Sequence, residues 1–288
     1  MKERTIMAFC PGHISGYFRR IEGRSVAATG SIGAGIVISE GVTATVSPAD
    51  STSVSVIQRT GRGKDFQYSR SSPLIESVLE KLGITVSVTT ESYLPIGAGF
   101  GLSAAALLAT LTAVDRCLEL RLTPHTIAAL AHEAEVVHRT GLGDVAACQG
   151  GGRVVRNGPG IDAVILRSFD LPESLHAVSF GPISTPSVLG SPQQMDRVAA
   201  AFPRYPPKNA KDFFKISRQF AEQSGLLTAE ASAVLHRCAA DNVPASMTML
   251  GNGVFACGKK ARKILSGFGE VYTFAVAGEG ARLVGVRP

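Results

Sequence analysis

One glycine-rich stretch, LPIGAGFGLSAAALLATLTAV at residues 94–114, constrains the fold of this chain more than any other feature. Its glycines at positions 97, 99 and 101 allow a tight turn and a close approach of the backbone to a ligand. The mostly apolar residues that follow from Ser103 predict a helix that is buried on most faces. Such a turn directs unpaired N–H groups and the positive end of the helix dipole at one point. The stretch therefore predicts an anion-binding site between a strand and a long helix.

Composition and length exclude several classes of protein. With 45% hydrophobic and 18% charged residues, 31 Gly and 15 Pro, the chain is not typical of disordered, collagen-like or coiled-coil proteins. Its 288 residues are about twice a typical domain, so we expect two domains that share one cleft. No apolar run approaches the roughly 20 residues of a membrane span, and the N-terminal residues lack a signal-like apolar core. We therefore expect a cytoplasmic protein with no membrane partner.

The charge balance narrows the class of partner. Lys and Arg number 29 against 23 Asp and Glu, for a net charge of +6, which favours either a nucleic acid or an anionic small molecule. The basic residues are scattered and are not interleaved with aromatic residues as in a single-strand binder. A phosphate-bearing small ligand is therefore predicted, with no nucleic acid, and a nucleic-acid binder stays as the alternative from another class.

The order of expected elements indicates an α+β protein. In the first part, β-rich runs lie at 5–9, 35–38, 42–46, 54–58 and 84–89. Helical spacing follows at 73–81, 103–118 and 124–139. The second part reads as strand, helices, strand, helix and two strands, which suggests helices on one face of a sheet. We place the boundary between about 169 and 176, which gives domains at 1–170 and 171–288.

The glycine-rich stretch resembles the phosphate-binding signature of the GHMP kinases, a family that includes galactokinase, homoserine kinase and mevalonate kinase. Phe100 and Leu102 depart from that signature, which has Leu and Ser there, and no Lys follows as in a Walker loop. The resemblance implies an α+β fold of two domains, the first like ribosomal protein S5 domain 2 and the second ferredoxin-like. It also implies that ATP phosphates are held by Pro95, Gly97, Gly99, Gly101, Ser103 and Ala104.

A second segment supports the same family. The run TGLGD at residues 140–144, followed by Gly150 and Gly151, looks like the segment that carries the catalytic Asp of mevalonate kinase-like enzymes, which implies that Asp144 is the base. PGHISGYF at 11–18 and GSIGAGIV at 30–37 resemble the archaeal branch that phosphorylates pantoate. That branch implies phosphorylation of the primary hydroxyl of pantoate to 4-phosphopantoate by ATP, on the route to coenzyme A. A GHMP kinase acting on mevalonate, homoserine or shikimate, or a GHMP-like protein without activity, is the alternative.

The helix before Asp144 offers a magnesium ligand. His132 and Glu135 share one face at a spacing of three, and this helix leads directly into the Asp144 loop. We therefore expect Glu135, with Ser103, to bind Mg²⁺, and His132 to contact the substrate. Mg²⁺ needs few carboxylates when phosphate oxygens and water complete its shell. Glu133 points about a hundred degrees away from this face and stays an alternative for the metal.

A substrate carboxylate needs a cation, and a guanidinium fits it best. Arg153 and Arg156 are the candidates, but a spacing of three places them on opposite faces of a strand, so only one can serve. The resemblance favours Arg156. Ser31, in an expected turn at 30–35, and His13, in an expected loop, are further substrate contacts by resemblance.

A homodimer is compatible with the sequence, which does not determine the oligomeric state.

Overall fold

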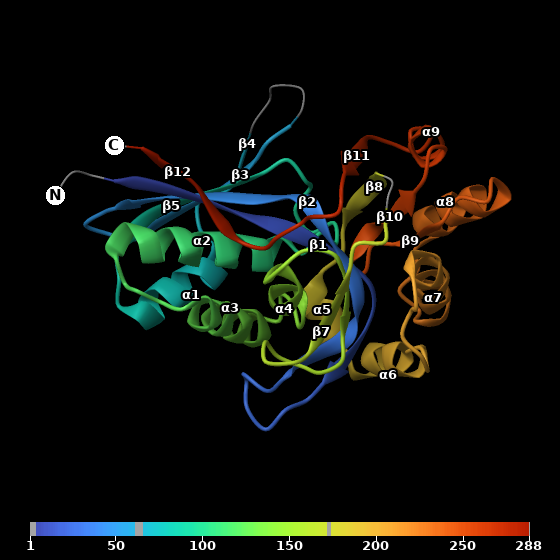
Figure 1. The fold of residues 1–288 in the computed structure, drawn as a ribbon, viewed down its shortest axis with the longest axis horizontal. Helices are drawn as coiled ribbons and strands as arrows, with labels where there is room; N and C mark the ends of the chain where they lie inside the picture. The colour runs from blue at the N-terminus through green and yellow to red at the C-terminus, as the bar shows by residue number, and fades with distance from the viewer. Residues whose placement is uncertain (1–3, 61–65, 172–173, 288) are drawn as a thin grey trace.

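The structure is a computed structural model that describes residues 4–60, 66–171 and 174–287. Its frame is a long antiparallel hairpin of β1 (Thr5–Ile21) and β2 (Gly30–Pro48) (Figure 1). Residues alternate between buried and half-buried positions in the first part of β1, as the β-rich run at 5–9 predicts. The predicted strands at 35–38 and 42–46 both lie within β2.

The hairpin corrects two expectations about its glycine-rich parts. His13 was expected in a loop and Ser31 in a turn, but both lie on paired strands. The chain stays extended because β1 and β2 supply each other's hydrogen bonds. The register of their pairing shifts between Pro11 and Gly12, where β1 has a bulge. Gly35 serves close packing in this hairpin, since a Cβ there would lie 2.1 Å from Nε2 of His13.

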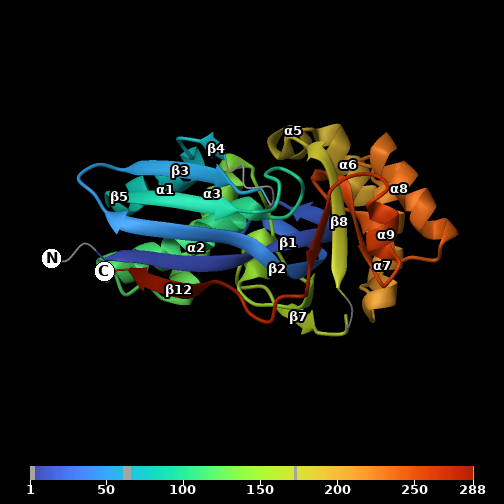
Figure 2. The same cartoon turned by 90° about the horizontal axis from the view of Figure 1, so that it is seen from above.

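The hairpin is the centre of an eight-stranded sheet with the order β12-β1-β2-β5-β3-β4, and β6 and β7 extend it beside β2. β3 is parallel to β5, and the other pairs are antiparallel. Figure 2 shows β3, β5, β2, β1 and β12 side by side. The further strands are β3 (Ser53–Gln58), β4 (Phe66–Ser69), β5 (Val86–Ser92), β6 (Arg153–Arg156), β7 (Ile165–Ser168) and β12 (Arg282–Arg287).

Three helices, α1 (Pro73–Leu82), α2 (Leu102–Leu118) and α3 (Pro124–His138), pack on one side of this sheet. α2 is buried around most of its circumference, which confirms the expectation from its apolar sequence. The predicted start of α3 is also confirmed, because the hydroxyl of Thr123 accepts a hydrogen bond from the N–H of Thr126 at 3.0 Å. A short helix, α4 (Asp144–Cys148), follows at the edge of this layer and was not expected.

The second sheet has four antiparallel strands in the order β11-β8-β10-β9. When β8, β9, β10 and β11 are numbered 1 to 4 in chain order, the spatial order is 4-1-3-2, and helices follow the first and the third strand. This is the ferredoxin-like arrangement that the family resemblance implies. Its elements are β8 (Leu175–Pro182), α7 (Ala210–Gln223), α8 (Ala229–Ala240), β9 (Ala245–Met247), β10 (Gly251–Cys257), α9 (Ala261–Leu265) and β11 (Val271–Phe274).

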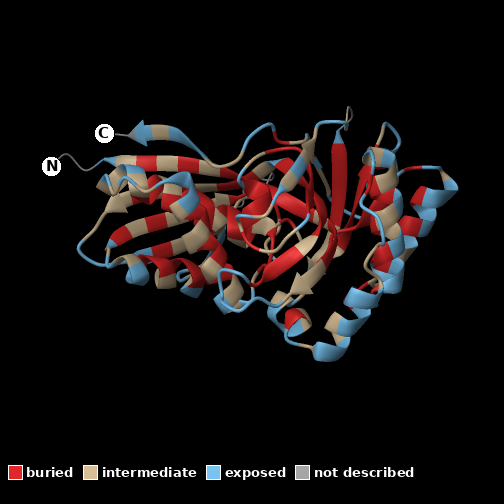
Figure 3. Ribbon diagram, turned by 60° about the horizontal axis from the view of Figure 1, so that its bottom comes forward, coloured by how far each residue is buried: buried red, intermediate tan, exposed pale blue. Residues whose placement is uncertain are grey.

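The connection after β8 holds two helices, α5 (Thr185–Leu189) and α6 (Pro192–Ala200). Buried residues run through the middle of the molecule and along β8 (Figure 3). The last strand, β12, returns to pair with β1 in the first sheet. The division at residue 170 stays a prediction, and part of the expected boundary, 172–173, lies outside the described residues. Among the described residues, no helix is both long and apolar enough to span a bilayer.

Candidate active site

A cleft of about 540 Å³ opens where the helix layer of the first sheet meets the connections of the second. Its apolar wall includes Phe18, Ile183, Leu189 and Met249. Its polar wall brings together most of the residues selected from the sequence, and these are Ser31, Gly97, Gly99, Gly101, Ser103, Asp144 and Arg156. The fold thus joins the glycine-rich stretch and the TGLGD segment in one space.

The glycine loop, residues 95–103, turns through three left-handed positions. Gly97, Gly99 and Gly101 have φ of 79°, 83° and 62°, values that side chains rarely adopt. A Cβ on Gly99 would lie 2.8 Å from the carbonyl oxygen of Met249, so the loop also packs tightly against the second sheet. Gly101 is the N-cap of α2, and the first N–H groups of that helix have no partner within it. The loop therefore presents donors and the helix dipole to the cleft.

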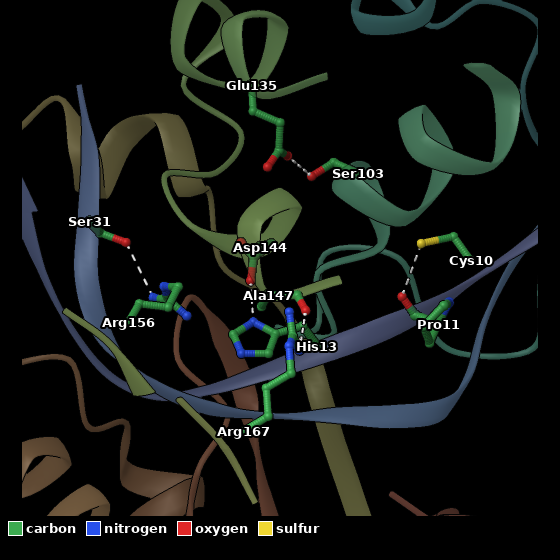
Figure 4. Close-up of polar contacts among 10 residues, drawn as sticks. All are labelled: Cys10, Pro11, His13, Ser31, Ser103, Glu135, Asp144, Ala147, Arg156 and Arg167. Carbon is green, nitrogen blue, oxygen red and sulfur yellow. Dashed lines mark hydrogen bonds and ion pairs between the residues drawn. The ribbon is translucent and has the colours of Figure 1, made fainter. Parts of the chain in front are cut away.

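Asp144 is the first residue of α4 and is held by His13. The Nδ1 of His13 lies 2.6 Å from Oδ1 of Asp144, and the imidazole is fully buried (Figure 4). Burial by itself raises the pKa of Asp144, but the hydrogen bond from His13 and the charges of His13 and Arg156 outweigh it and lower that pKa. Burial lowers the pKa of His13. The ionised form of the Asp144 carboxyl is therefore favoured, and it accepts the Nδ1–H of His13.

Glu135 lies on the other side of Asp144 and contacts Ser103. The Oγ of Ser103 donates a hydrogen bond to Oε1 of Glu135 at 2.5 Å (Figure 4). The Thr140 hydroxyl donates a second to the same oxygen at 3.2 Å. Burial, followed by the negative charge of Asp144, raises the pKa of Glu135 to about 8. Glu133 turns away and pairs with Lys81 at 2.6 Å. Of the two glutamates, only Glu135 approaches the glycine loop.

The two candidate arginines of β6 differ in their partners. Both are 2% exposed, but Arg153 makes a two-point ion pair with Asp170 at 3.0 and 2.9 Å. Arg156 donates one hydrogen bond, from Nη2 to Oγ of Ser31 at 3.3 Å. Its Nε and Nη1 are buried without a hydrogen-bond partner among the described residues. Arg156 thus offers buried donors to an incoming anion, whereas Arg153 is already paired.

Five of the selected residues do not line the cleft, but two of them, His13 and Glu135, contact Asp144 and Ser103, which do. The other three are His132, Ala104 and Pro95. His132 is 2% exposed, and its Nε2 lies 2.9 Å from the carbonyl oxygen of Thr29, so it supports the start of β2. The side chain of Ala104 is buried and Pro95 is half-buried, and neither belongs to the cleft wall. The contacts of these three residues with substrate or phosphate stay predictions.

The glycines of TGLGD are explained by the side chains around them. A Cβ on Gly141 would lie 2.3 Å from Oε2 of Glu135, and a Cβ on Gly143 would lie 2.6 Å from Oγ of Ser31. Each glycine therefore makes room for a polar side chain of the site. Sequence reasoning missed Arg167, which donates to backbone carbonyls behind Asp144, because a lone Arg in a short strand carries no motif.

Known proteins share this arrangement. A family model described as the GHMP kinases N terminal domain matches residues 71–152. A pantoate kinase of Methanospirillum hungatei is 43% identical over 284 residues, covering 99% of this chain and 98% of that protein. A pantoate kinase of Thermococcus kodakarensis is 33% identical, covering 94% of this chain and 95% of that one. Mevalonate kinases, among them that of Thermococcus sibiricus, match over shorter stretches, here 64 residues at 42% identity.

Solved structures align with this chain over almost its whole length. One described as a phosphotransferase related to the CoA biosynthesis pathway aligns with a TM-score of 0.77 and 27% identity, over 97% of this chain and 98% of that one. A mevalonate-3-kinase from Thermoplasma acidophilum has a TM-score of 0.64 at 14% identity over the full length of both chains, a likeness of fold alone. Fold and site together define an ATP-dependent small-molecule kinase with the two-domain α+β GHMP architecture. Within that class, the chain belongs to the pantoate kinase family.

Proposed function

We propose that this chain transfers the γ-phosphoryl group of ATP to the primary hydroxyl of pantoate, giving 4-phosphopantoate and ADP on the route to coenzyme A. One observation carries the proposal. A single cleft holds an anion-binding glycine loop, a carboxylate oriented by a buried histidine, and a buried guanidinium with unused donors. The identity of 43% to a pantoate kinase over nearly the whole chain supports the choice of substrate.

The roles of the site residues follow from the nature of phosphoryl transfer. Its transition state is loose in most analyses, so catalysis depends chiefly on alignment and on neutralising the phosphate charge. The N–H groups of residues 97–103 bind the phosphates of ATP. Asp144 accepts a hydrogen bond from the acceptor hydroxyl, orients its oxygen for in-line attack and receives its proton. His13 acts through Asp144, because its Nδ1 is already committed to that carboxylate.

The part of the cleft that contains Arg156 and Ser31 suits a small apolar hydroxy acid as the phosphoryl acceptor. Arg156 and Ser31 bind the carboxylate of pantoate, using Nε and Nη1 of the guanidinium, for which the described residues provide no hydrogen-bond partner. The apolar side chains of Phe18, Ile183 and Leu189 in the same cleft suit the two methyl groups at its centre. Homoserine carries an ammonium group, which the charge of Arg156 disfavours. His132 supports this part of the cleft through the carbonyl of Thr29.

Magnesium fits the oxygen atoms beside the glycine loop. Glu135 is buried beside Asp144, its hydrogen-bond partners in the described part of the chain are the hydroxyls of Ser103 and Thr140, and burial followed by the charge of Asp144 raises its pKa to about 8. A carboxylate and a hydroxyl are hard oxygen ligands of the kind that Mg²⁺ takes together with phosphate oxygens and water. Glu135 and Ser103 would therefore hold the ion, which supplies charge neutralisation of the phosphates when bound.

Glu135 gives a prediction for stability as well as for activity. A carboxyl whose folded pKa is raised from 4.5 to about 8 stabilises the fold fully below pH 4.5 and loses that contribution as the pH rises through 8. We therefore expect Glu135→Gln to flatten the fall in Tm of the ligand-free protein between about pH 5 and pH 8, and to raise Tm at pH 8 by several degrees. Turnover with MgATP should fall by about 10²-fold. An unchanged Tm-against-pH curve in thermal melts would contradict this assignment.

The proposed reaction is tested with a panel of acceptors. Purified protein with ATP and Mg²⁺ is offered pantoate, pantothenate, mevalonate, homoserine and shikimate, and ADP release is measured by a coupled assay. We expect the highest kcat/KM with pantoate, and a higher value with any other acceptor would overturn the substrate. Salt-sensitive binding of an oligonucleotide would support the nucleic-acid alternative. Size-exclusion chromatography tests whether the protein forms a homodimer, with which the sequence is compatible.

A further inference from the structure

Arg167 lies behind the catalytic carboxylate and binds the end of the helix that carries it. From β7, its Nη1 donates to the carbonyl oxygens of Ala147 at 3.0 Å and Gly151 at 2.8 Å, and its Nη2 donates to that of Ala146 at 3.4 Å. Figure 4 shows the guanidinium beside Ala147 and the His13 ring. One half-buried cation therefore joins the last turn of α4 to the glycine turn that follows it.

This contact matters because α4 cannot hold itself in place. It has five residues, so almost none of its carbonyls has a partner inside the helix, and an isolated helix of this length is unstable. The segment continues into three consecutive glycines, 150–152, which leave its end free to turn. The positive charge of Arg167 lies at the carbonyl end of α4, where it stabilises the helix.

The local sequence is adapted to this guanidinium. A Cβ on Gly150 would lie 3.0 Å from both Cζ and Nε of Arg167, tighter than an ordinary van der Waals contact. Gly150 therefore leaves space for the flat guanidinium to lie against the turn. The Gly150–Gly151 pair, which the motif comparison identified without a mechanism, is explained in part by Arg167.

We propose that Arg167 is a positioning residue for the phosphoryl transfer: by clamping the carbonyl end of α4 it sets the position of Asp144 at the other end. The inference depends on the proposed role of Asp144 as the group that orients the acceptor hydroxyl. A displacement of about 1 Å in such a group lowers the rate by about 10²-fold, so a clamp on a short helix has a measurable effect on kcat.

The charge of Arg167 also acts on the Asp144–His13 pair. The charged groups that act on His13 are Asp144 from α4, Arg156 from β6 and Arg167 from β7. Burial is the largest cause that lowers the pKa of His13, the bond to Asp144 opposes it, and the two arginines lower it further. Loss of the Arg167 charge should therefore raise the pKa of His13, and protonated His13 would make Asp144 a weaker acceptor.

The test compares Arg167→Met and Arg167→Lys with Arg218→Met as the matched control. Arg218 is also a half-buried arginine that donates to a helix carbonyl, that of Leu235 at 3.1 Å, but it lies in α7 away from the cleft. With pantoate and ATP, we expect Arg167→Met to lower kcat by about 10- to 100-fold with both KM values within about twofold. Its acid limb in the pH profile of kcat should move to higher pH. Arg218→Met should lower Tm and leave kcat unchanged.

Arg167→Lys distinguishes the effect of the positive charge at position 167 from the effect of its hydrogen-bond geometry. Lys keeps the charge but donates from a single point, so we expect a smaller loss of kcat and no movement of the acid limb. If Arg167→Met does not fold, a wild-type kcat in Arg167→Lys overturns the inference, and a loss of kcat at unchanged KM supports it. A folded Arg167→Met with wild-type kcat and pH profile also overturns it. Asp144→Asn distinguishes the two proposals, because full activity in that variant removes the proposed function itself.

Discussion

Asp144→Asn is expected to lower kcat with pantoate by about 10²–10⁴-fold while the protein stays folded and binds ATP. Asn has nearly the same size, so the start of α4 is retained. Its amide, however, cannot receive the proton of the acceptor hydroxyl, and it weakens the short contact with His13, which is 2.6 Å long in the native protein. The measurement is steady-state kcat by ADP release, with nucleotide binding followed by calorimetry.

The same substitution has an independent electrostatic readout. Asp144 is one of the causes that raise the pKa of Glu135 to about 8, so removing its charge should lower that pKa and reduce the dependence of stability on pH between about 5 and 8. A kcat within tenfold of the native value would show that Asp144 is not the acceptor of the hydroxyl proton. A loss of ATP binding in parallel with kcat would instead point to a general disturbance of the glycine loop.

Arg156→Met is the second variant with a large expected effect. We expect kcat/KM for pantoate to fall by about 10²–10³-fold, because a lost charge pair to a buried carboxylate costs about 2–5 kcal/mol. The KM for ATP should change little. The Tm of the ligand-free protein should stay the same or rise, since the variant removes a buried cation whose Nε and Nη1 have no partner among the described residues.

Arg153→Met is the control for this variant, because the residue lies on the same strand with the same burial. Arg153 is bound to Asp170 within the protein, so its loss should lower Tm and leave kcat/KM for pantoate within about threefold. The two arginines are thus expected to show opposite patterns in stability and in substrate use. Equal losses of kcat/KM in both variants would contradict the assignment of the carboxylate to Arg156.

Local signals were enough for the helices and the glycine loop. The tight turn at Gly97, Gly99 and Gly101 and the start of α3 at Pro124 are determined by residues adjacent in the chain, and both were predicted. The long hairpin was not predicted beyond its apolar runs. Pro11 and the glycines of 30–35 are usual signals for turns, but pairing of β1 with β2 supplies hydrogen bonds that override them.

In the site, too, some features follow from the local sequence and others from tertiary contacts. Periodicity placed Glu135 and His132 on one face of α3, but it did not say which neighbour covers each face. The structure pairs Glu133 with Lys81 of α1 and leaves Glu135 beside Ser103. The difference between the two arginines of β6 also depends on a distant residue, since Asp170 pairs with Arg153 and not with Arg156.

By itself, the sequence determined the glycine-rich turn, the helix that follows it, the family and the residues with suitable chemistry, because these depend on neighbours in the chain or on motifs. Only the tertiary structure decided that His13 contacts Asp144 across 131 positions, that Arg156 rather than Arg153 has unpaired donors among the described residues, and that Arg167 binds the carbonyl end of α4. The physical reason is that burial and charge act through space, and their strength at each group depends on which distant segments the fold brings into contact.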